Sequence, residues 1–260
     1  MNSVAEIYDN LSAFEGRKKT NAYPIHKTLS IGREKTSVLD WLLNKVHFLS
    51  GECVLDVGCG TGYSLSKLAI ERGINGFGIS ISKKEIELAN LFAKKAGIDD
   101  QIQYNQQNFD SQISGEYDKI IAIESLKHSD DIAYSLRNIV GNLSDKGMLI
   151  IADDFVNKEN ELVEQHKSLW ETPGFISLDN LQKKMSEVKE FNFKTYDLSP
   201  MVNKRPYWLL LVMITVVRFV KSTIPVMNQR SIDTYLGGLL LESFYHKKIV
   251  SYHLIVAEKR

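Results

Sequence analysis

A glycine-rich loop is the first feature of the sequence that is suited to binding a ligand. An apolar run at residues 53–57 leads directly into Gly58-Cys59-Gly60-Thr61-Gly62, and a helical pattern follows at residues 63–72. Glycine lacks the side chain that keeps a ligand away from the backbone, and Asp56 can orient such a loop through its amide groups. Three alternating glycines exceed what a tight turn between a strand and a helix requires. The loop therefore predicts a binding site for a small ligand.

A carboxylate and an imidazole form a second candidate for chemistry. Glu124 and His128 lie just after the apolar run at residues 118–123. Ligands of open α/β sheets bind at the carboxyl ends of the strands, so we expect Glu124 to lie at the ligand-binding edge. Either group can act as a base. The alternatives are a carboxylate that only anchors its loop and a histidine that caps the next helix, and the sequence does not decide between Glu124 and His128 as the base.

The sequence gives less support to a metal site or to a dinucleotide-binding site. A dinucleotide loop has the pattern G-x-G-x-x-G with an acidic residue about 20 residues further on. After Gly58-Cys59-Gly60 its third glycine would fall on Tyr63, and the strand-like run at residues 76–81 ends without a carboxylate. Hydride transfer is thus a minor alternative. No metal site is expected, because the other histidines share no ligand spacing: His26, His47, His166, His246 and His253.

The elements that must position these residues alternate between strand and helix. Such alternation is typical of βαβ units with a mostly parallel sheet and helices on both of its faces. We expect an α/β fold with a seven-stranded sheet. Its predicted strands cover residues 53–57, 76–81, 102–107, 118–123, 148–152, 193–198 and 250–257. Its predicted helices cover residues 63–72, 83–95, 130–143 and 178–188.

The glycine loop resembles motif I of the Rossmann-like, class I methyltransferases that use S-adenosylmethionine. The resemblance extends from residue 51 to residue 259. It implies that S-adenosylmethionine is the cofactor and that the loop holds its methionyl part. The residues implied in this contact are Asp56, Gly58, Cys59, Gly60 and Gly62.

The end of the second strand departs from the usual pattern of this family, in which an acidic residue binds the ribose hydroxyls. Residues 76–85 are instead similar to the branch that contains cyclopropane synthases and the tocopherol and sterol C-methyltransferases. Ser80 occupies the threonine position of that branch and Glu85 its glutamine position, with Ile81 between them. The resemblance places all three in the cofactor site. Glu85 is expected either to bind the ribose or to be a solvated residue in the first turn of a helix.

The resemblance also assigns residues near the adenine and the sulfonium. Asn108 stands where the family commonly has an aspartate that accepts from the adenine amino group, and Phe109 would pack on the adenine or belong to the ordinary core. Residues 124–128 are similar to the Glu-Ser-x-x-His segment of tocopherol-type enzymes. Glu124 would then steady the positive cofactor and remove a proton when an alkene carbon is methylated.

Two segments are expected to cover the cofactor edge of the methyltransferase domain, which we assign to residues 51–260. One is a helical extension at residues 1–50, and the other is a lid insertion at about residues 200–247, before the last strand. The insertion contains the apolar run 206–217, which is shorter than the ~20 residues of a membrane-spanning helix. Residues 206–221 have three interpretations: a core-packed lid helix, a lining of the acceptor pocket, or a peripheral membrane contact.

The composition of the chain limits the chemical class of the methyl acceptor that we expect. The chain of 260 residues has 32 basic and 32 acidic residues, so no overall field favours nucleic acid. Two cysteines and the lack of a signal-peptide pattern favour the cytoplasm, with membrane association left open. We expect a methyltransferase for a small hydrophobic acceptor, isoprenoid or lipid-like, with C-methylation ahead of O- or N-methylation. A catalytically inactive, methyltransferase-like binding module is the alternative, and the oligomeric state stays open.

Overall fold

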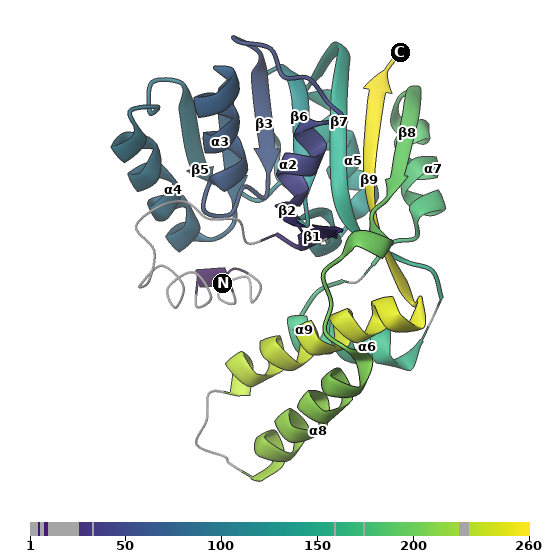
Figure 1. The fold of residues 1–260 in the computed structure, drawn as a ribbon. Coiled ribbons are helices and arrows are strands. Elements are labelled where there is room, and N and C mark those ends of the chain that lie inside the picture. The colour runs from purple at the N-terminus through teal and green to yellow at the C-terminus, as the bar shows by residue number, and fades with distance from the viewer. Residues whose placement is uncertain are drawn as a thin grey trace.

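A seven-stranded sheet forms the centre of the molecule (Figure 1). The computed structural model describes Ala5, Tyr8, Asp9 and residues 26–32, 34–158, 160–173, 175–223 and 229–260. The strand order is β5-β4-β3-β6-β7-β9-β8, and β9 is the antiparallel partner of both β7 and β8, while β3 to β7 pair in parallel. The bounds are β3 Cys53–Val57, β4 Asn75–Ser80, β5 Ile102–Gln106, β6 Tyr117–Ile123, β7 Leu143–Val156, β8 Phe191–Asp197 and β9 Val250–Lys259. The predicted α/β fold class is confirmed.

Helices cover both faces of this sheet because successive side chains of its central strands point to opposite sides and are apolar on both. Val54 joins one hydrophobic cluster and its neighbour Leu55 joins the other. The first cluster includes side chains from three helices: α2 Val38–Leu43, α3 Tyr63–Arg72 and α4 Lys83–Ala96. The second includes side chains from α5 Ile132–Gly141 and α7 Leu178–Val188.

The strand β7 is longer than the sequence predicts. The apolar pattern covers residues 148–152, whereas β7 runs from Leu143 to Val156 and includes Asp153 and Asp154. Aspartate is depleted in strands, so a pair of them normally marks a strand end. Here both are buried and each forms an ion pair with a lysine, which allows the strand to continue.

The described part of the N-terminal extension contains more than helix. A two-stranded antiparallel sheet, β1 Thr28–Ile31 with β2 Glu34–Ser37, precedes α2. Most of residues 1–25 lies outside the described residues. Tyr8 and Asp9 are described and contact the sheet edge.

A group of helices lies beyond the carboxyl edge of the sheet (Figure 1). It consists of α6 Glu161–Trp170, α8 Tyr207–Thr223 and α9 Gln229–Lys247, and α9 packs against both other helices. The segments α8 and α9 belong to the expected insertion, and α6 joins them from outside it. Among the described helices, none is both long and apolar enough to cross a membrane.

The packing of α6 on α9 can be tested at two adjacent glycines. A Cβ at Gly237 would lie 2.1 Å from Cδ1 of Trp170, whereas a Cβ at Gly238 has nothing within 4 Å. We expect Gly237→Ala to lower the free energy of unfolding in urea. Gly238→Ala should raise it by up to about 1 kcal/mol, because alanine favours a helix interior. Equal effects of the two substitutions would contradict this packing.

Candidate functional site

The candidate site lies where the carboxyl ends of β3, β4, β6 and β7 meet. The loop after β3 touches the loop after β6, since a Cβ at Gly58 would lie 2.4 Å from Cβ of Ser125. It also touches β4, because a Cβ at Gly78 would lie 3.0 Å from that of Cys59. Residues from distant parts of the sequence therefore share one edge, as the sequence analysis expects.

Backbone conformation and close packing both explain why the loop contains glycine. All three have backbone angles in the left-handed region, with φ of 80° at Gly58, 52° at Gly60 and 79° at Gly62. At Gly62 a Cβ would also lie 2.7 Å from the ring of Tyr104, whose hydroxyl donates to the Gly62 carbonyl at 2.9 Å. The protein's own packing thus requires glycine at positions 58 and 62. The expectation that these two glycines also admit a ligand stays a prediction.

Asp56, at the base of the loop, has a buried oxygen without a partner. No hydrogen-bond partner of its Oδ2 atom is found among the described residues. Burial raises the pKa of this carboxyl to about 7. An unsatisfied buried acceptor is costly, which indicates that a donor outside the described protein atoms completes this site.

A buried carboxylate, that of Glu85, contacts the end of β4. Ser80 donates to Oε2 of Glu85 at 2.7 Å, and both side chains are buried. Glu85 lies in the first turn of α4, where its own N–H donates to Ser82, the residue that caps this helix. The interpretation of Glu85 as a solvated residue is therefore wrong. Ile81 follows the strand and is half-buried.

Asn108 and Phe109 come after the end of β5. Oδ1 of Asn108 accepts from the N–H of Asp110 at 2.9 Å, so this oxygen already stabilises a local turn. Phe109 is buried in the same hydrophobic cluster as Val57 and Ile79. Contacts of either residue with an adenine ring remain predictions.

Glu124 is held in one position from two sides. Its backbone, with φ of 57°, lies in the left-handed region and donates to the Ala152 carbonyl at 2.7 Å. Its Oε1 accepts from the N–H of Lys27 at 2.7 Å and from the hydroxyl of Tyr252 at 2.9 Å. Burial would raise the pKa of this carboxyl, but the charges of Lys27, Lys127 and His26 together hold it below its ordinary value. Glu124 is therefore ionised at neutral pH.

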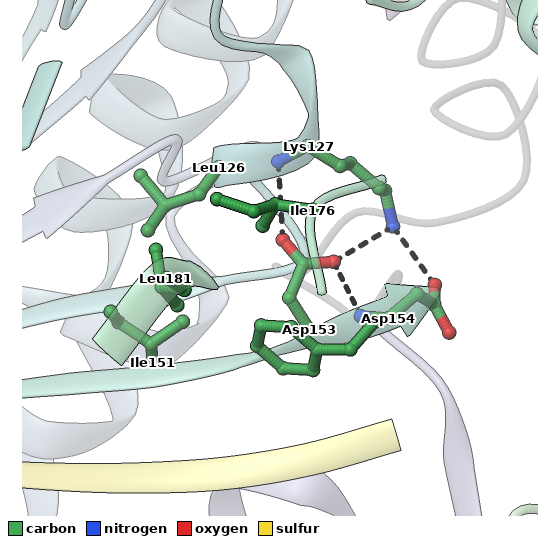
Figure 2. A pocket seen from close by; sticks show the side chains of 8 residues that line it. Leu126, Lys127, Ile151, Asp153, Asp154, Ile176 and Leu181 are labelled. Carbon is green, nitrogen blue, oxygen red and sulfur yellow. Dashed lines mark hydrogen bonds and ion pairs between the residues drawn. The ribbon is translucent and has the colours of Figure 1, made fainter. Parts of the chain in front are cut away.

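Glu124 belongs to a group of charged side chains that we call the ion cluster: Lys27, Glu124, Lys127, Asp153 and Asp154. The Nζ atom of Lys27 lies 2.7 Å from Oδ2 of Asp154 and 3.4 Å from Oε2 of Glu124. Lys127 reaches both aspartates, at 3.3 Å and 3.4 Å (Figure 2). The cavity beside them measures about 10 Å³, which is room for one water molecule.

Asp154 connects the ion cluster to the helices beyond the sheet. Its Oδ1 accepts from the hydroxyl of Tyr245 on α9. Burial would raise the pKa of Asp154, but Lys27 and Lys127 together with the hydrogen bonds hold it at about 2. One carboxylate therefore joins the N-terminal segment, the sheet and α9.

His128 is neutral and contacts Tyr8. Its Nε2 lies 2.8 Å from the hydroxyl of Tyr8, and its buried Nδ1 has no partner among the described residues. Burial and the charge of Lys127 lower its pKa to about 3. The next helix, α5, is capped by Asp131, so the interpretation of His128 as that cap is wrong.

Comparison with known proteins identifies the family. Residues 49–198 match a family model described as a methyltransferase domain. The chain belongs to this family. An O-methyltransferase of Aspergillus sclerotiorum is 34% identical over 148 residues, which cover 54% of each protein. The ubiquinone biosynthesis O-methyltransferase of Aeromonas salmonicida (strain A449) is 34% identical over 117 residues, 44% of this chain and 48% of that protein. The chain spans about half the length of the curated relatives it matches.

Solved structures place this methyltransferase in the Rossmann-like, class I fold. A geranyl diphosphate methyltransferase in complex with GPP and sinefungin has a TM-score of 0.75 at 15% identity, covering 99% of this chain and 98% of that one. A cyclopropane synthase of Mycobacterium tuberculosis has a TM-score of 0.70 at 15% identity, covering 98% and 97%. Identities this low establish the fold alone. The cofactor of this class is S-adenosylmethionine.

The site of this methyltransferase fits that cofactor in two respects. The amino group of S-adenosylmethionine is a donor of the kind that the unpartnered oxygen of Asp56 requires. The buried carboxylate of Glu85, in the first turn of α4, accepts from Ser80 at the end of β4, which is the strand end where the family usually has an acidic residue.

Sequence reasoning missed several residues of the site: Lys27, Asp153, Asp154, Tyr245 and Tyr252. Only Asp153 and Asp154 gave a signal, as consecutive aspartates directly after a buried apolar run. The others come from segments 91 to 128 positions away from their partners, so no local pattern marks them.

Cofactor binding can be tested at Gly60 with Gly97 as the matched control. Both have left-handed backbone angles, with φ of 52° at Gly60 and 69° at Gly97. Gly97 lies at the C-terminal end of α4, outside the glycine loop, and a Cβ there would have nothing within 4 Å. Alanine at either position carries a similar backbone cost of about 1–2 kcal/mol. We expect Gly60→Ala to weaken binding of S-adenosylhomocysteine by about tenfold or more in calorimetry, because a methyl group enters the loop. Gly97→Ala should bind normally, and equal affinities would contradict the assignment of the loop.

The neutral state of His128 predicts an acid-sensitive fold. The pKa of His128 is about 3 in the folded protein and about 6.5 in the unfolded chain, so between these values only the unfolded chain binds the proton. The free energy of unfolding therefore falls as the pH drops from about 6.5 toward 3. His166, with a pKa lowered to about 4 by burial, acts in the same direction. We expect His128→Gln to flatten the dependence of the unfolding free energy on pH between about 6.5 and 4. The exposed His47→Gln is the control, and an unchanged slope in His128→Gln would show that His128 is not held neutral.

Proposed function

We propose that this chain transfers a methyl group from S-adenosylmethionine to a small hydrophobic acceptor. The observation that carries the proposal is the ionised carboxylate of Glu124, of which 15% of the side chain is exposed and whose neighbour Ser125 packs against Gly58 of the glycine loop. The N-terminal segment together with α8 and α9 would cover this edge. The residues that we assign to the cofactor are Asp56, Gly58, Cys59, Gly60, Gly62, Ser80, Ile81, Glu85, Asn108 and Phe109.

The charge of the ion cluster suits a positive reactant. Three carboxylates lie with two ammonium groups, so the cluster favours one further positive charge when all are ionised. When bound, S-adenosylmethionine supplies a methyl group on a positively charged sulfur, which is open to in-line displacement. Glu124 then lies where it can attract that charge and stabilise the charge that passes to the acceptor.

The proton chemistry favours an alkene carbon as the methyl acceptor. When an alkene takes up a methyl cation, the C–C bond forms with the alkene electrons and a positive carbon remains. A proton next to that carbon is so acidic that a carboxylate with a lowered pKa accepts it, and its C–H electrons restore the double bond. Removing a hydroxyl proton instead calls for a base with a pKa near the working pH. Glu124 and His128 both lack such a pKa, so C-methylation of an isoprenoid or lipid-like acceptor is the better fit.

O-methylation is the second candidate. The curated relatives named above are O-methyltransferases, and the buried Nδ1 atom of His128 has no hydrogen-bond partner among the described residues. In that case His128 is the residue to test. A binding module without turnover is separated from both candidates by a single measurement, the transfer of labelled methyl to any acceptor.

Glu124→Gln distinguishes the candidates. Glutamine keeps the size of the side chain and an acceptor for Lys27, but it removes charge and basicity. With ¹³C-methyl-labelled cofactor and an isoprenyl diphosphate as acceptor, we expect kcat to fall by about 10²–10⁴. Affinity for S-adenosylhomocysteine should change much less. The product of the unmodified protein should show its new methyl on carbon in the NMR spectrum.

The pH profile and a second variant complete this test. The active form of Glu124 is deprotonated and its pKa lies below the ordinary 4.5, so kcat should stay level as the pH falls from about 8 to about 5. His128→Asn should retain turnover within a few-fold. A methyl group found on oxygen, together with loss of turnover in His128→Asn only, would replace C-methylation by O-methylation.

A further inference from the structure

The helix α8 is apolar on two opposite faces, and only one of them is covered. Leu210 and Ile214 are 0% and 6% exposed and belong to the hydrophobic core. On the other face an apolar stripe is 46–68% exposed: Trp208, Leu211, Val212, Val216 and Phe219. Spacings of three and four residues place these side chains along one line of the helix. The interpretation of residues 206–221 as a core-packed lid helix therefore holds for one face of the helix only.

The apolar stripe lies at the outer end of the molecule. In Figure 1, α8 is the helix farthest from the sheet, and it packs against α9. Thr215 lies within the stripe, but its hydroxyl donates to the Leu211 carbonyl at 2.8 Å. Its polar group is thus satisfied inside the helix and does not need water, which suits a stripe that enters an apolar medium.

The charges near the stripe are one-sided. Residues 200–232 contain no aspartate or glutamate but five basic residues: Lys204, Arg205, Arg218, Lys221 and Arg230. Arg205 and Lys221 pair with Glu242 and Asp233 of α9, and Arg230 pairs with Glu171, so these three charges are compensated. Arg218, which is exposed, donates to the neutral side chain of Gln165 at 2.8 Å and so adds a full positive charge to this part of the surface.

We propose that α8 docks the protein on an anionic lipid membrane. The helix would lie parallel to the membrane, with the apolar stripe at the boundary between headgroups and acyl chains and the basic residues among the phosphates. Trp208 and Phe219 are 11 positions apart, about 16 Å along the helix, so they anchor both ends of the stripe. A tryptophan at this depth keeps its ring in the apolar layer and its N–H in the headgroups.

A second copy of the chain is the weaker occupant. A symmetric dimer through this face would set α8 against α8. The exposed Arg218 of each copy would then face residues 200–232 of the other, which supply no carboxylate to pair with it. Anionic headgroups supply the charge that the face lacks.

Vesicle binding by the full chain tests the proposal. We expect it to sediment with vesicles that contain about 30% phosphatidylserine and to bind phosphatidylcholine vesicles much more weakly. The double variant Trp208→Gln, Phe219→Gln should reduce binding by about tenfold or more, because two exposed apolar anchors are lost. Raising the salt from about 0.1 M to about 0.5 M should weaken binding of the unmodified protein.

The matched control replaces apolar residues of similar exposure elsewhere. Ile70 on α3 and Leu91 on α4 are 57% and 64% exposed, and Ile70→Gln, Leu91→Gln should bind vesicles normally. Circular dichroism should show all three proteins equally folded. Equal losses in both double variants, or no binding to anionic vesicles, would overturn the proposal. So would sedimentation-velocity data in which the α8 variant only converts a dimer into a monomer.

Discussion

The ion cluster at the carboxyl ends of β6 and β7 is the interaction on which the rest of the site depends. It places three carboxylates and two ammonium groups in a largely buried volume, where an unpaired charge is strongly unfavourable. The partners come from three parts of the chain: Lys27 precedes β1, Glu124 and Lys127 follow β6, and Asp153 and Asp154 belong to β7. The complete cluster therefore requires Lys27 to lie at the sheet edge.

The same cluster fixes the charge states on which the proposed chemistry depends. The lysines hold Glu124 ionised in surroundings where burial alone would favour its neutral form. Burial and the positive charge of Lys127 lower the pKa of His128, so the imidazole next to Lys127 is neutral. The surroundings therefore favour the charged form of Glu124 and the neutral form of His128. Such divergence is typical of sites where acid–base roles are divided.

The sequence predicts the parts of this arrangement that have local causes. Apolar periodicity gives the parallel sheet and its crossover helices, and the glycine loop and Glu124 follow from their places at strand ends. It does not predict Lys27, Tyr245 or Tyr252, because their partners are remote in sequence and their residue types are common on any surface. It also cannot show that Ser125 and Tyr104 require glycine at positions 58 and 62, since packing is a tertiary property. For the same reason the apolar run in α8 gives no sign of which face is covered.

One helix links the ion cluster with the apolar stripe on α8. The buried face of α8 packs on α9, and Tyr245 of α9 donates to Asp154. The helix α9 is buried along most of its length, so it is held by the core and does not move freely with α8. A surface that binds α8 therefore binds a helix that packs on α9, and α9 contacts the sheet through Asp154. The outer face and the site therefore belong to one continuous packed structure, in which Asp154 contacts both Lys27 and Tyr245 of α9.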